Sequence, residues 1–430
     1  TGRYDSVALG NQVTIDNAVA GIGVAVNTYD ASNYGTAIGN SALVDNSSYA
    51  GTAIGNFAKV QQSAFGTALG NAATVSNSYA SQALGSKTSV TDSNRASAIG
   101  DSAKVATSSD ALAAGSTANV ANSGRGTAIG YSANVQNSFS SNVLGSGFKV
   151  FDSENSNAVG NSAVNSSKRA TAVGNSANIT SSSDALATGA TANVVNSERG
   201  TAVGFAANVQ NGFASNALGS GAKVFDSSNA TSVGNATVSS NSNFSTAVGN
   251  SAKVTNSVNA GSFGQNASVT NSANSTALGQ NAIVNNSNSA MALGQKSLVD
   301  GSINASAVGY GSQVINNSIY SQAFGASNTI DGSQYATAVG KSTTITTSDN
   351  AIGMGNTASV TSAKDGIAIG TKASVNNAAA SIALGSNSSV TVANSVALGA
   401  GSTATTAAVP VNSATVGPYT YSGFAGTAPV

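Results

Sequence analysis

The amino-acid sequence repeats itself about every fifteen residues, from near its first residue to about residue 404. Residues 51–60 read GTAIGNFAKV, and residues 66–75 read GTALGNAATV. Almost every copy contains a glycine after an aliphatic residue, and these glycines follow one another at steps of 15 residues, with a few steps of 14 or 16; one copy has Ala25 in place of the glycine. With roughly 27 copies, the chain is one array of small units rather than a set of globular domains.

Within each copy, apolar residues recur at every second position, which is the spacing of a β-strand. Each copy holds two short strands, and the turn between them begins at the repeated glycine. Strands this brief must pair with the same strands of neighbouring copies. The sequence therefore predicts an all-β fold, a parallel β-roll solenoid with one coil of about fifteen residues per copy. The first turn glycines are Gly39, Gly55, Gly70, Gly85 and Gly100.

The two faces of the first strand differ in side-chain size. The aliphatic residue before the glycine shares a face with the residue two positions earlier, as in Thr67 and Leu69, and this face is predicted to fill the coil. The residue between them is Ala, Ser or Gly in almost every copy and is predicted to face outward. A column of small residues that no charge enters indicates close approach of identical chains in a closed oligomer. The predicted interface residues are Ala37, Ala53, Ala68, Ala83, Ala98, Ala128, Ala247 and Ala277.

The composition excludes several classes of function. The chain has 16 Lys and Arg, 16 Asp and Glu, no His and no Cys. The charges balance without a basic stripe, which is atypical of nucleic-acid binding. The chain lacks thiolate and imidazole ligands and the commonest general base. Residues 95–168 also match residues 169–242, and a single catalytic site would not survive such copying. We expect no enzymatic activity, no cofactor and no metal site.

The repeats resemble the head domains of trimeric autotransporter adhesins, the YadA-like bacterial surface fibres. Stretches such as SAIGDSA at residues 97–103 carry the resemblance, which covers roughly residues 6–404. The resemblance implies a left-handed β-roll, a homotrimer, and a place on the outer membrane through a stalk and an anchor outside this sequence. It also implies adhesion to matrix proteins such as collagen, to host cells, or to other bacteria in autoagglutination and biofilm. Many Asn-rich loops here are one residue longer than the commonest family form.

Two groups of residues are candidates for ligand binding. The first is four aromatic residues in the variable turns of consecutive copies, which either bind a partner or seal the turn against a neighbouring chain. They are Tyr34, Tyr49, Phe65 and Tyr79. The second resembles a family segment linked to collagen binding, with Leu398 in place of Ile. The alternative interpretation is that it is a plain coil of the roll. It comprises Asn394, Ser395, Val396, Ala397, Leu398, Gly399 and Ser402.

The repeat array and the C-terminal segment are predicted to be separate parts. We predict a head over residues 1–404 and a capping or connecting segment over residues 405–430, leading towards a neck. All three prolines, Pro410, Pro418 and Pro429, follow the last repeated glycine. The aromatic residues of this segment are predicted to cover the open end of the solenoid. They are Tyr419, Tyr421 and Phe424.

Two other functions are alternatives. An ice-binding or mineral-binding solenoid needs unbroken ranks of Thr, and the rank that includes Thr36, Thr52 and Thr67 is interrupted at Gln82 and Leu112. A structural trimeric fibre of the phage or S-layer type shares the predicted architecture. The adhesin head remains the preferred prediction.

Overall fold

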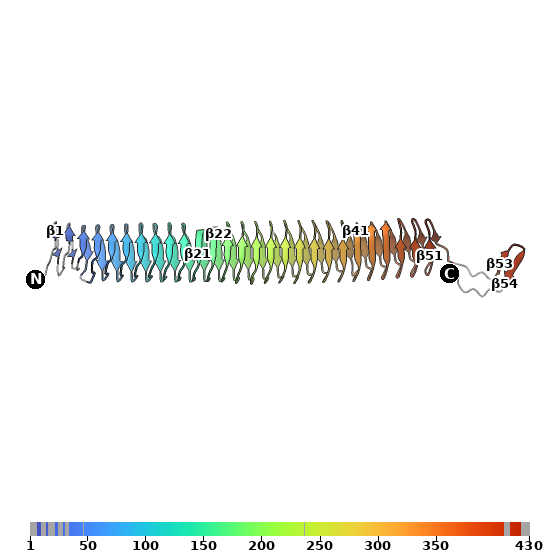
Figure 1. Ribbon diagram of the computed structural model, residues 1–430, viewed down its shortest axis with the longest axis horizontal. Helices are drawn as coiled ribbons and strands as arrows, with labels where there is room; N and C mark the ends of the chain where they lie inside the picture. The colour runs from blue at the N-terminus through green and yellow to red at the C-terminus, as the bar shows by residue number, and fades with distance from the viewer. Residues whose placement is uncertain are drawn as a thin grey trace. The chain divides into compact units, whose positions relative to one another are not determined.

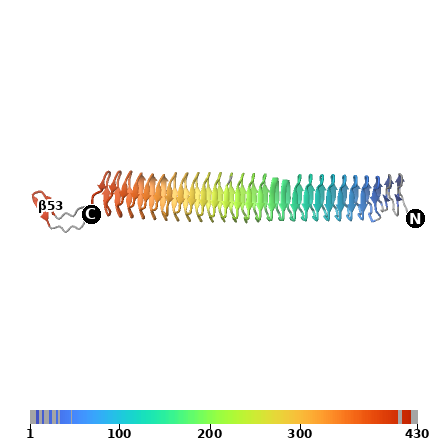
Figure 2. The same ribbon diagram turned by 180° about the vertical axis from the view of Figure 1, so that it is seen from behind.

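The computed structural model describes residues 7–9, 14–15, 22–24, 29–30, 34–45, 47–235, 237–407 and 413–422. The chain divides into two compact units, Thr1–Ala222 (unit 1) and Lys223–Val430 (unit 2), and each is described by itself. The described residues contain strands and no helix, which confirms the all-β prediction. Each unit is a parallel β-solenoid, and the described strands form about 25 turns in all (Figure 1). The view from behind shows the same regular stacking of coils (Figure 2).

Each coil of unit 1 contributes a first strand, before the turn glycine, and a second strand after it. The first strands are β1 (Val7–Leu9), β3 (Ile22–Val24), β5 (Thr36–Ile38), β7 (Thr52–Ile54), β9 (Thr67–Leu69), β11 (Gln82–Leu84), β13 (Ser97–Ile99), β15 (Leu112–Ala114), β17 (Thr127–Ile129), β19 (Asn142–Leu144), β23 (Leu186–Thr188), β25 (Thr201–Val203) and β27 (Asn216–Leu218). The second strands are β2 (Thr14–Ile15), β4 (Tyr29–Asp30), β6 (Leu43–Val44), β8 (Lys59–Gln61), β10 (Thr74–Ser76), β12 (Ser89–Thr91), β14 (Lys104–Ala106), β16 (Asn119–Ala121), β18 (Asn134–Gln136), β20 (Lys149–Phe151), β24 (Asn193–Val195) and β26 (Asn208–Gln210). In two coils one strand runs through both positions, β21 (Asn157–Asn165) and β22 (Thr171–Thr180).

Unit 2 has the same order of strands, followed by a separate hairpin. The first strands are β29 (Thr231–Val233), β31 (Thr246–Val248), β33 (Gly261–Phe263), β35 (Thr276–Leu278), β37 (Met291–Leu293), β39 (Ser306–Val308), β41 (Gln322–Ala326), β43 (Thr337–Lys341), β45 (Ile352–Asn356), β47 (Ile367–Ile369), β49 (Ile382–Leu384) and β51 (Val396–Leu398). The second strands are β28 (Lys223–Phe225), β30 (Val238–Ser240), β32 (Lys253–Thr255), β34 (Ser268–Thr270), β36 (Ile283–Asn285), β38 (Leu298–Asp300), β40 (Gln313–Ile315), β42 (Thr329–Asp331), β44 (Thr344–Thr346), β46 (Ser359–Thr361), β48 (Ser374–Asn376), β50 (Ser389–Val390) and β52 (Thr403–Ala404). The hairpin consists of β53 (Ser413–Val416) and β54 (Tyr419–Ser422).

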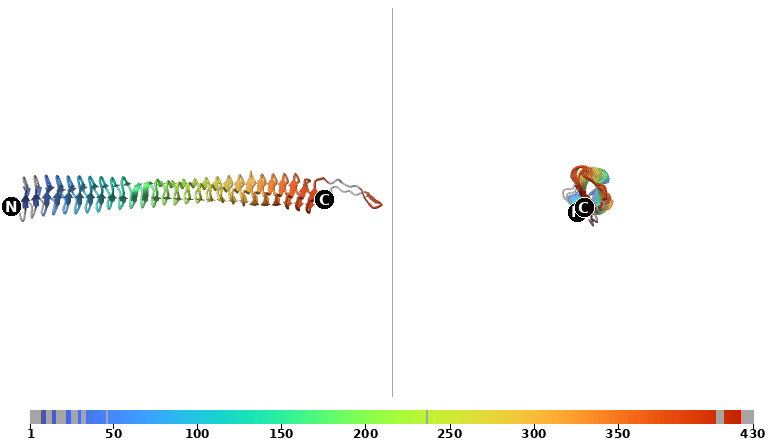
Figure 3. Two further views of the ribbon diagram at one scale, coloured as in Figure 1. Left: turned by 90° about the horizontal axis from the view of Figure 1, so that it is seen from above. Right: turned by 90° about the vertical axis from the view of Figure 1, so that its right-hand side faces the viewer.

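Equivalent strands of successive coils pair in parallel, in the register that the repeat dictates. In β7 and β9, Ala53 pairs with Ala68 and Ile54 pairs with Leu69. Identical positions therefore lie in columns along each unit, about 4.8 Å apart from one coil to the next. Seen from above, the coils within each unit lie parallel to one another (Figure 3).

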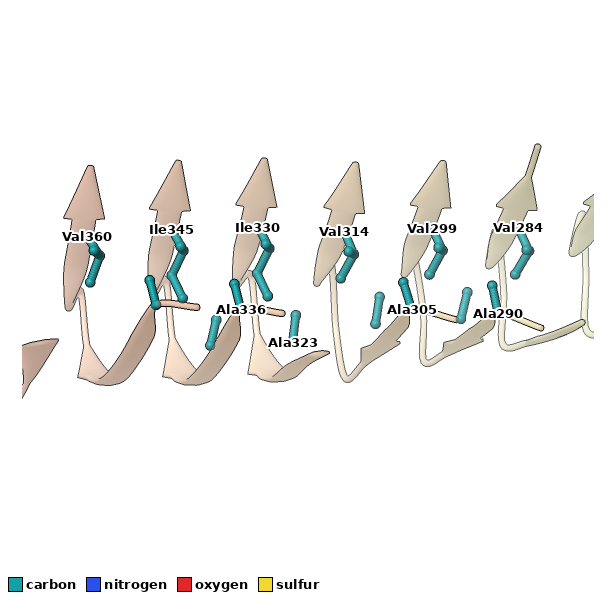
Figure 4. Close-up of a cluster of buried hydrophobic side chains, with 14 of the residues drawn as sticks. Val284, Ala290, Val299, Ala305, Val314, Ala323, Ile330, Ala336, Ile345 and Val360 are labelled. Atoms are coloured by element: carbon teal, nitrogen blue, oxygen red, sulfur yellow. The ribbon is translucent and has the colours of Figure 1, made fainter. Parts of the chain in front are cut away.

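Small side chains fill the space between the two strands of a coil. In residues 52–66 the inward side chains are those of Ala53, Ala58, Val60 and Ser63, and all four are fully buried. The backbone of Gly66 is also buried. The close-up of unit 2 shows the same arrangement, with a column of Val and Ile on the second strands pointing towards a column of Ala (Figure 4). The interior is a thin, close-packed layer.

The predicted orientation of the first strand was wrong. The alanine column lies inside the coil, and each of the eight predicted interface alanines has an exposed fraction of 0% in the single chain. They are Ala37, Ala53, Ala68, Ala83, Ala98, Ala128, Ala247 and Ala277. The neighbouring aliphatic side chains point outward instead, and Leu69 is 46% exposed. The physical reason is the narrow interior, in which the first strand places a single methyl group opposite the Val of the second strand in most coils, while Val143 is buried in the same column.

A column of serines satisfies the backbone at the turn that leads from one coil to the next. The amide of Ser78 donates to Ser63 Oγ at 3.0 Å, and Ser78 Oγ donates to the carbonyl of Ser76 at 2.6 Å. The same pair of bonds recurs at Ser93 and Ser108. Each hydroxyl therefore accepts from one coil and donates within its own, so these buried polar groups are all paired.

The turn glycines adopt a backbone conformation that other residues rarely adopt. Their φ angles lie in the left-handed region that glycine favours. For the first five they are 133°, 135°, 139°, 131° and 124°, at Gly39, Gly55, Gly70, Gly85 and Gly100. A side chain there would also meet the backbone of the next coil, because an added Cβ on Gly100 would lie 2.7 Å from the carbonyl oxygen of Gly115.

One coil of unit 2 has a polar residue in the column that Val normally occupies. Ser239 of β30 pairs with Val224 and Val254 of the adjacent coils and is fully buried. Its hydroxyl makes no hydrogen bond within the described part of the chain. A buried hydroxyl without a partner costs about 1–3 kcal/mol, so this coil is a weak point of unit 2.

Replacing Ser239 with Val is therefore expected to stabilise its coil by about 1–3 kcal/mol. Val fits because the same column holds Val on both sides. Hydrogen exchange resolved by mass spectrometry should show slower exchange in β30 and its neighbours. The reverse substitution, Val254→Ser, should speed exchange in β32. Faster exchange in Ser239→Val would contradict this account of the weak coil.

The C-terminal segment contains a short antiparallel hairpin. β53 pairs with β54, with Val416 opposite Tyr419 and a turn at Gly417 and Pro418. Tyr419 is 67% exposed. Pro410, Phe424, Pro429 and the side chain of Tyr421 lie outside the described residues. The capping role of residues 405–430 stays a prediction.

Candidate interaction surfaces

Two strand faces and two turns make up the outer surface of every coil, and residues 52–66 serve to define them. The apolar face consists of the outward residues of the first strands, such as Thr52 and Ile54. The polar face consists of the outward residues of the second strands, such as Lys59 and Gln61. The glycine turn joins the first strand to the second. The crest, here residues 62–66, leads from the second strand to the next coil.

The apolar face is exposed to a degree that is unusual for aliphatic side chains. Leu69, Leu144 and Leu278 are 46%, 52% and 46% exposed. No outward residue that flanks the central small residue of a described first strand is charged. Soluble monomers rarely expose contiguous apolar patches of this extent, so this face has the character of a contact surface.

The polar face differs sharply from the apolar face. Its outward residues are mostly Lys, Asn, Gln, Ser and Thr, and several are charged. The charged residues of this face are Lys59, Lys104, Lys149, Lys223, Lys253, Asp300 and Asp331. Amide side chains also link successive coils, as where Asn119 Nδ2 donates to Asn134 Oδ1 at 2.9 Å. A face of this composition is stable in water without a partner.

The four aromatic residues predicted as a ligand site come together on the crest of unit 1. The rings of Tyr34, Tyr49, Phe65 and Tyr79 form an unbroken series of edge-to-face contacts, with centroids 5.5, 5.5 and 5.7 Å apart. All four side chains are about half exposed. We call this group the aromatic ladder. The ring contacts account for its order, and the exposed ring surfaces leave area for a partner.

Charged residues continue the crest of unit 1 beyond the aromatic ladder. Arg95 donates through Nε and a terminal nitrogen to the two carboxylate oxygens of Asp110, at 2.6 and 2.9 Å. This hydrogen bonding lowers the pKa of Asp110 and raises that of Arg95. The guanidinium of Arg125 lies 5.6 Å from the centre of the ring of Phe139, which is on the next coil.

The duplicated block repeats these crest contacts. Arg169 pairs with Asp184, and the guanidinium of Arg199 lies 5.4 Å from the ring of Phe213. The pKa of Asp184 is lowered in the same way, by hydrogen bonds from Arg169. Both carboxylates thus act as partners of arginine in the turns. These exposed contacts order the crest and contribute little stability.

The segment that resembles a collagen-binding sequence forms the last described first strand, β51, and its flanking turns. Ala397 is buried inside the coil, whereas Val396 and Leu398 are 61% and 70% exposed. Asn394 lies on the crest with φ 57°, and Ser402 Oγ donates to the carbonyl of Leu398 at 2.7 Å. The accessible part of this segment is therefore an end of the apolar face. Its role in collagen binding stays a prediction.

Acidic side chains do not gather into a metal-binding group in the part of the chain that the structure describes. Among these same residues, no helix is long and apolar enough to cross a membrane. The expected absence of catalysis and of cofactors stays a prediction.

The main surface that sequence reasoning missed is the exposed apolar face. The signal was present, because charged residues enter the second strands, as at Lys59 and Lys104, but never flank the central residue of the described first strands. A face that excludes charge over so many coils has the character of a surface that contacts a partner.

In comparisons with known proteins, no family model and no curated protein matches this chain. Its function is therefore argued from its own surfaces.

Proposed function

We propose that this chain is a non-enzymatic adhesive head at the bacterial outer-membrane surface, assembled as a homotrimer of left-handed rolls. Its partners would be matrix proteins such as collagen, host cells or other bacteria. The resemblance of the repeats to YadA-like heads supplies the adhesin class, the trimer and the location. The observation on this chain that supports the proposal most is the contrast between its two strand faces, because charged residues enter the polar face but not the apolar face of the described strands.

The regular spacing of side chains along the apolar face supports self-association. Its side chains repeat once per coil, about 4.8 Å apart. A partner can cover such a face over many coils only if its own surface repeats with the same rise, and a second copy of this chain does so. The polar face and both turns would then remain in water, where their composition suits them.

The crest supports adhesion, because it carries exposed aromatic side chains that do not fill the coil. Tyr and Arg are enriched among residues that dominate binding between proteins. The aromatic ladder and Arg95 lie on neighbouring coils of one crest. Repeated weak contacts from several copies of the head would add to one another, as adhesion to a surface requires.

Replacing Tyr49, Phe65 and Tyr79 with Asn is expected to weaken adhesion at least about tenfold, because truncating a central aromatic residue typically costs about 2 kcal/mol or more. Asn is compatible with the crest, since Asn94 and Asn259 occupy the same columns. The measurement is attachment of cells that display the full chain to fibrillar collagen, to cultured epithelial cells and to one another.

The matched control replaces Tyr131 and Phe205 with Ser. Both are 63% exposed but lie at glycine turns, away from the aromatic ladder. This control should adhere like the parent chain. If the parent chain attaches to none of the three targets, the adhesin proposal fails. If both variants lose adhesion equally, the aromatic ladder is not the contact site.

A further inference from the structure

The apolar face changes its composition at the C-terminal end of unit 2. From β5 to β43, the first outward residue of each first strand is mostly Thr, Ser, Asn or Gln, with Leu or Met at only three positions. In β45, β47, β49 and β51 it is Ile or Val, and the second outward residue is also aliphatic. Both columns are therefore apolar over four successive coils, whereas elsewhere in the described strands this occurs only in β1 and β3 at the start of unit 1 and in isolated coils such as that of β37.

These four coils carry apolar side chains in both outward columns, and the last coil exposes them most. Ile352 and Met354 are 37% and 43% exposed, and Leu384 is 39% exposed. Val396 and Leu398 reach 61% and 70%. The opposite face of the same coils carries Ser and Thr or Asn on β46 and β48, so the contrast between the two faces is greatest here.

The edges that border this part of the apolar face carry opposite charges. Lys341 and Lys372 are exposed on the glycine turn, and Asp349 and Asp365 are exposed on the crest, where Lys364 is beside Asp365. In a closed ring of identical subunits, each subunit presents one edge to the opposite edge of the next. The two lysines of one copy would thus meet the two aspartates of its neighbour. The occupant that fits both the period and the charges is another copy of this chain.

We propose that the four coils of β45, β47, β49 and β51 are the site at which copies of this chain join most tightly, an inference that rests on the self-association in the proposed function. The remainder of the apolar face, with Thr in one of its two columns, contributes less per coil. Assembly is then strongest at one end of unit 2.

The test uses substitutions that the fold already accepts. Replacing Ile352, Ile367 and Ile382 with Thr restores the commonest residue of that column, as in Thr337, and leaves every buried side chain in place. The control triple replaces Leu112, Leu186 and Met291 with Thr. These are the three apolar residues that occur in the same column between β5 and β43.

Analytical ultracentrifugation of the full chain over a dilution series measures dissociation. The Ile triple is expected to raise the concentration of half-dissociation by more than about tenfold, and the control triple by less than about threefold. Equal shifts for the two triples, or no shift for the Ile triple, would overturn the inference while self-association stands. A parent chain that sediments as a monomer throughout would overturn both.

Discussion

Alanine in place of Gly100 is expected to unfold its coil locally. The residue has φ 124°, a conformation that only glycine adopts readily. An added Cβ would lie 2.7 and 2.8 Å from the carbonyl oxygen and carbon of Gly115, which belong to backbone and have nowhere to move. Strain and overlap together should cost about 3 kcal/mol or more. Hydrogen exchange in β13 and β15 should become about a hundredfold faster.

Gly147 provides the matched control for Gly100. It has φ 75°, and an added Cβ would have no atom within 4 Å. Ala72 occupies the same place in another coil with φ 55°. Gly147→Ala should therefore cost only about 1 kcal/mol. If Gly100→Ala and Gly147→Ala change exchange equally, the close approach between successive glycine turns does not constrain the fold.

The repeat alone predicts the strands, their pairing and their register. The step of 15 residues between glycines places Ala53 beside Ala68 and Ile54 beside Leu69, and the structure pairs these residues. The reason is that a solenoid of identical coils has a single register in which every column is uniform. The left-handed sense and the trimer follow from the resemblance and stay proposals.

The inward and outward faces of the first strand could not be predicted from alternation alone. A period of two separates Ala68 from Thr67 and Leu69 but does not say which set faces inward. The usual preference for large apolar side chains inside favours Leu69, and that choice was wrong. The deciding quantity is the width of the interior. The Val column of the second strand and the serine column of the crest already fill much of this space, so the first strand contributes a single methyl group in most coils, with Val143 as an exception.

The same width explains why the four aromatic residues of the ladder lie in turns. The largest fully buried side chains are Ile and Val, and Phe148 is the one aromatic side chain among the buried residues of the described part of the chain. Tyr49 and Phe65 are therefore displayed rather than packed in the coil, although nothing in their sequence neighbourhood distinguishes an aromatic turn residue that binds from one that only contacts its neighbours. The structure adds the contact geometry of the rings, and the adhesion experiment is needed for the rest.

Two adjacent arginine substitutions in β35 should have opposite consequences. Ala277 is fully buried, and Arg in its place would bring a charge and a long side chain into a layer that holds one methyl group, at a cost of several kcal/mol. Its coil should unfold whether the chain is a monomer or an oligomer. Leu278 is 46% exposed on the apolar face, so Leu278→Arg should leave the coil folded.

Leu278→Arg acts on assembly instead, because an unpaired charge in an apolar interface opposes association. In the proposed trimer, three such charges would be brought close to identical surfaces. Sedimentation should show a folded variant with weakened assembly, and hydrogen exchange in β33 and β37 should match that of the dissociated parent chain. The opposite pattern, with Ala277→Arg folded and monomeric and Leu278→Arg still assembled, would return the interface to the alanine column and refute the orientation of the first strand described here.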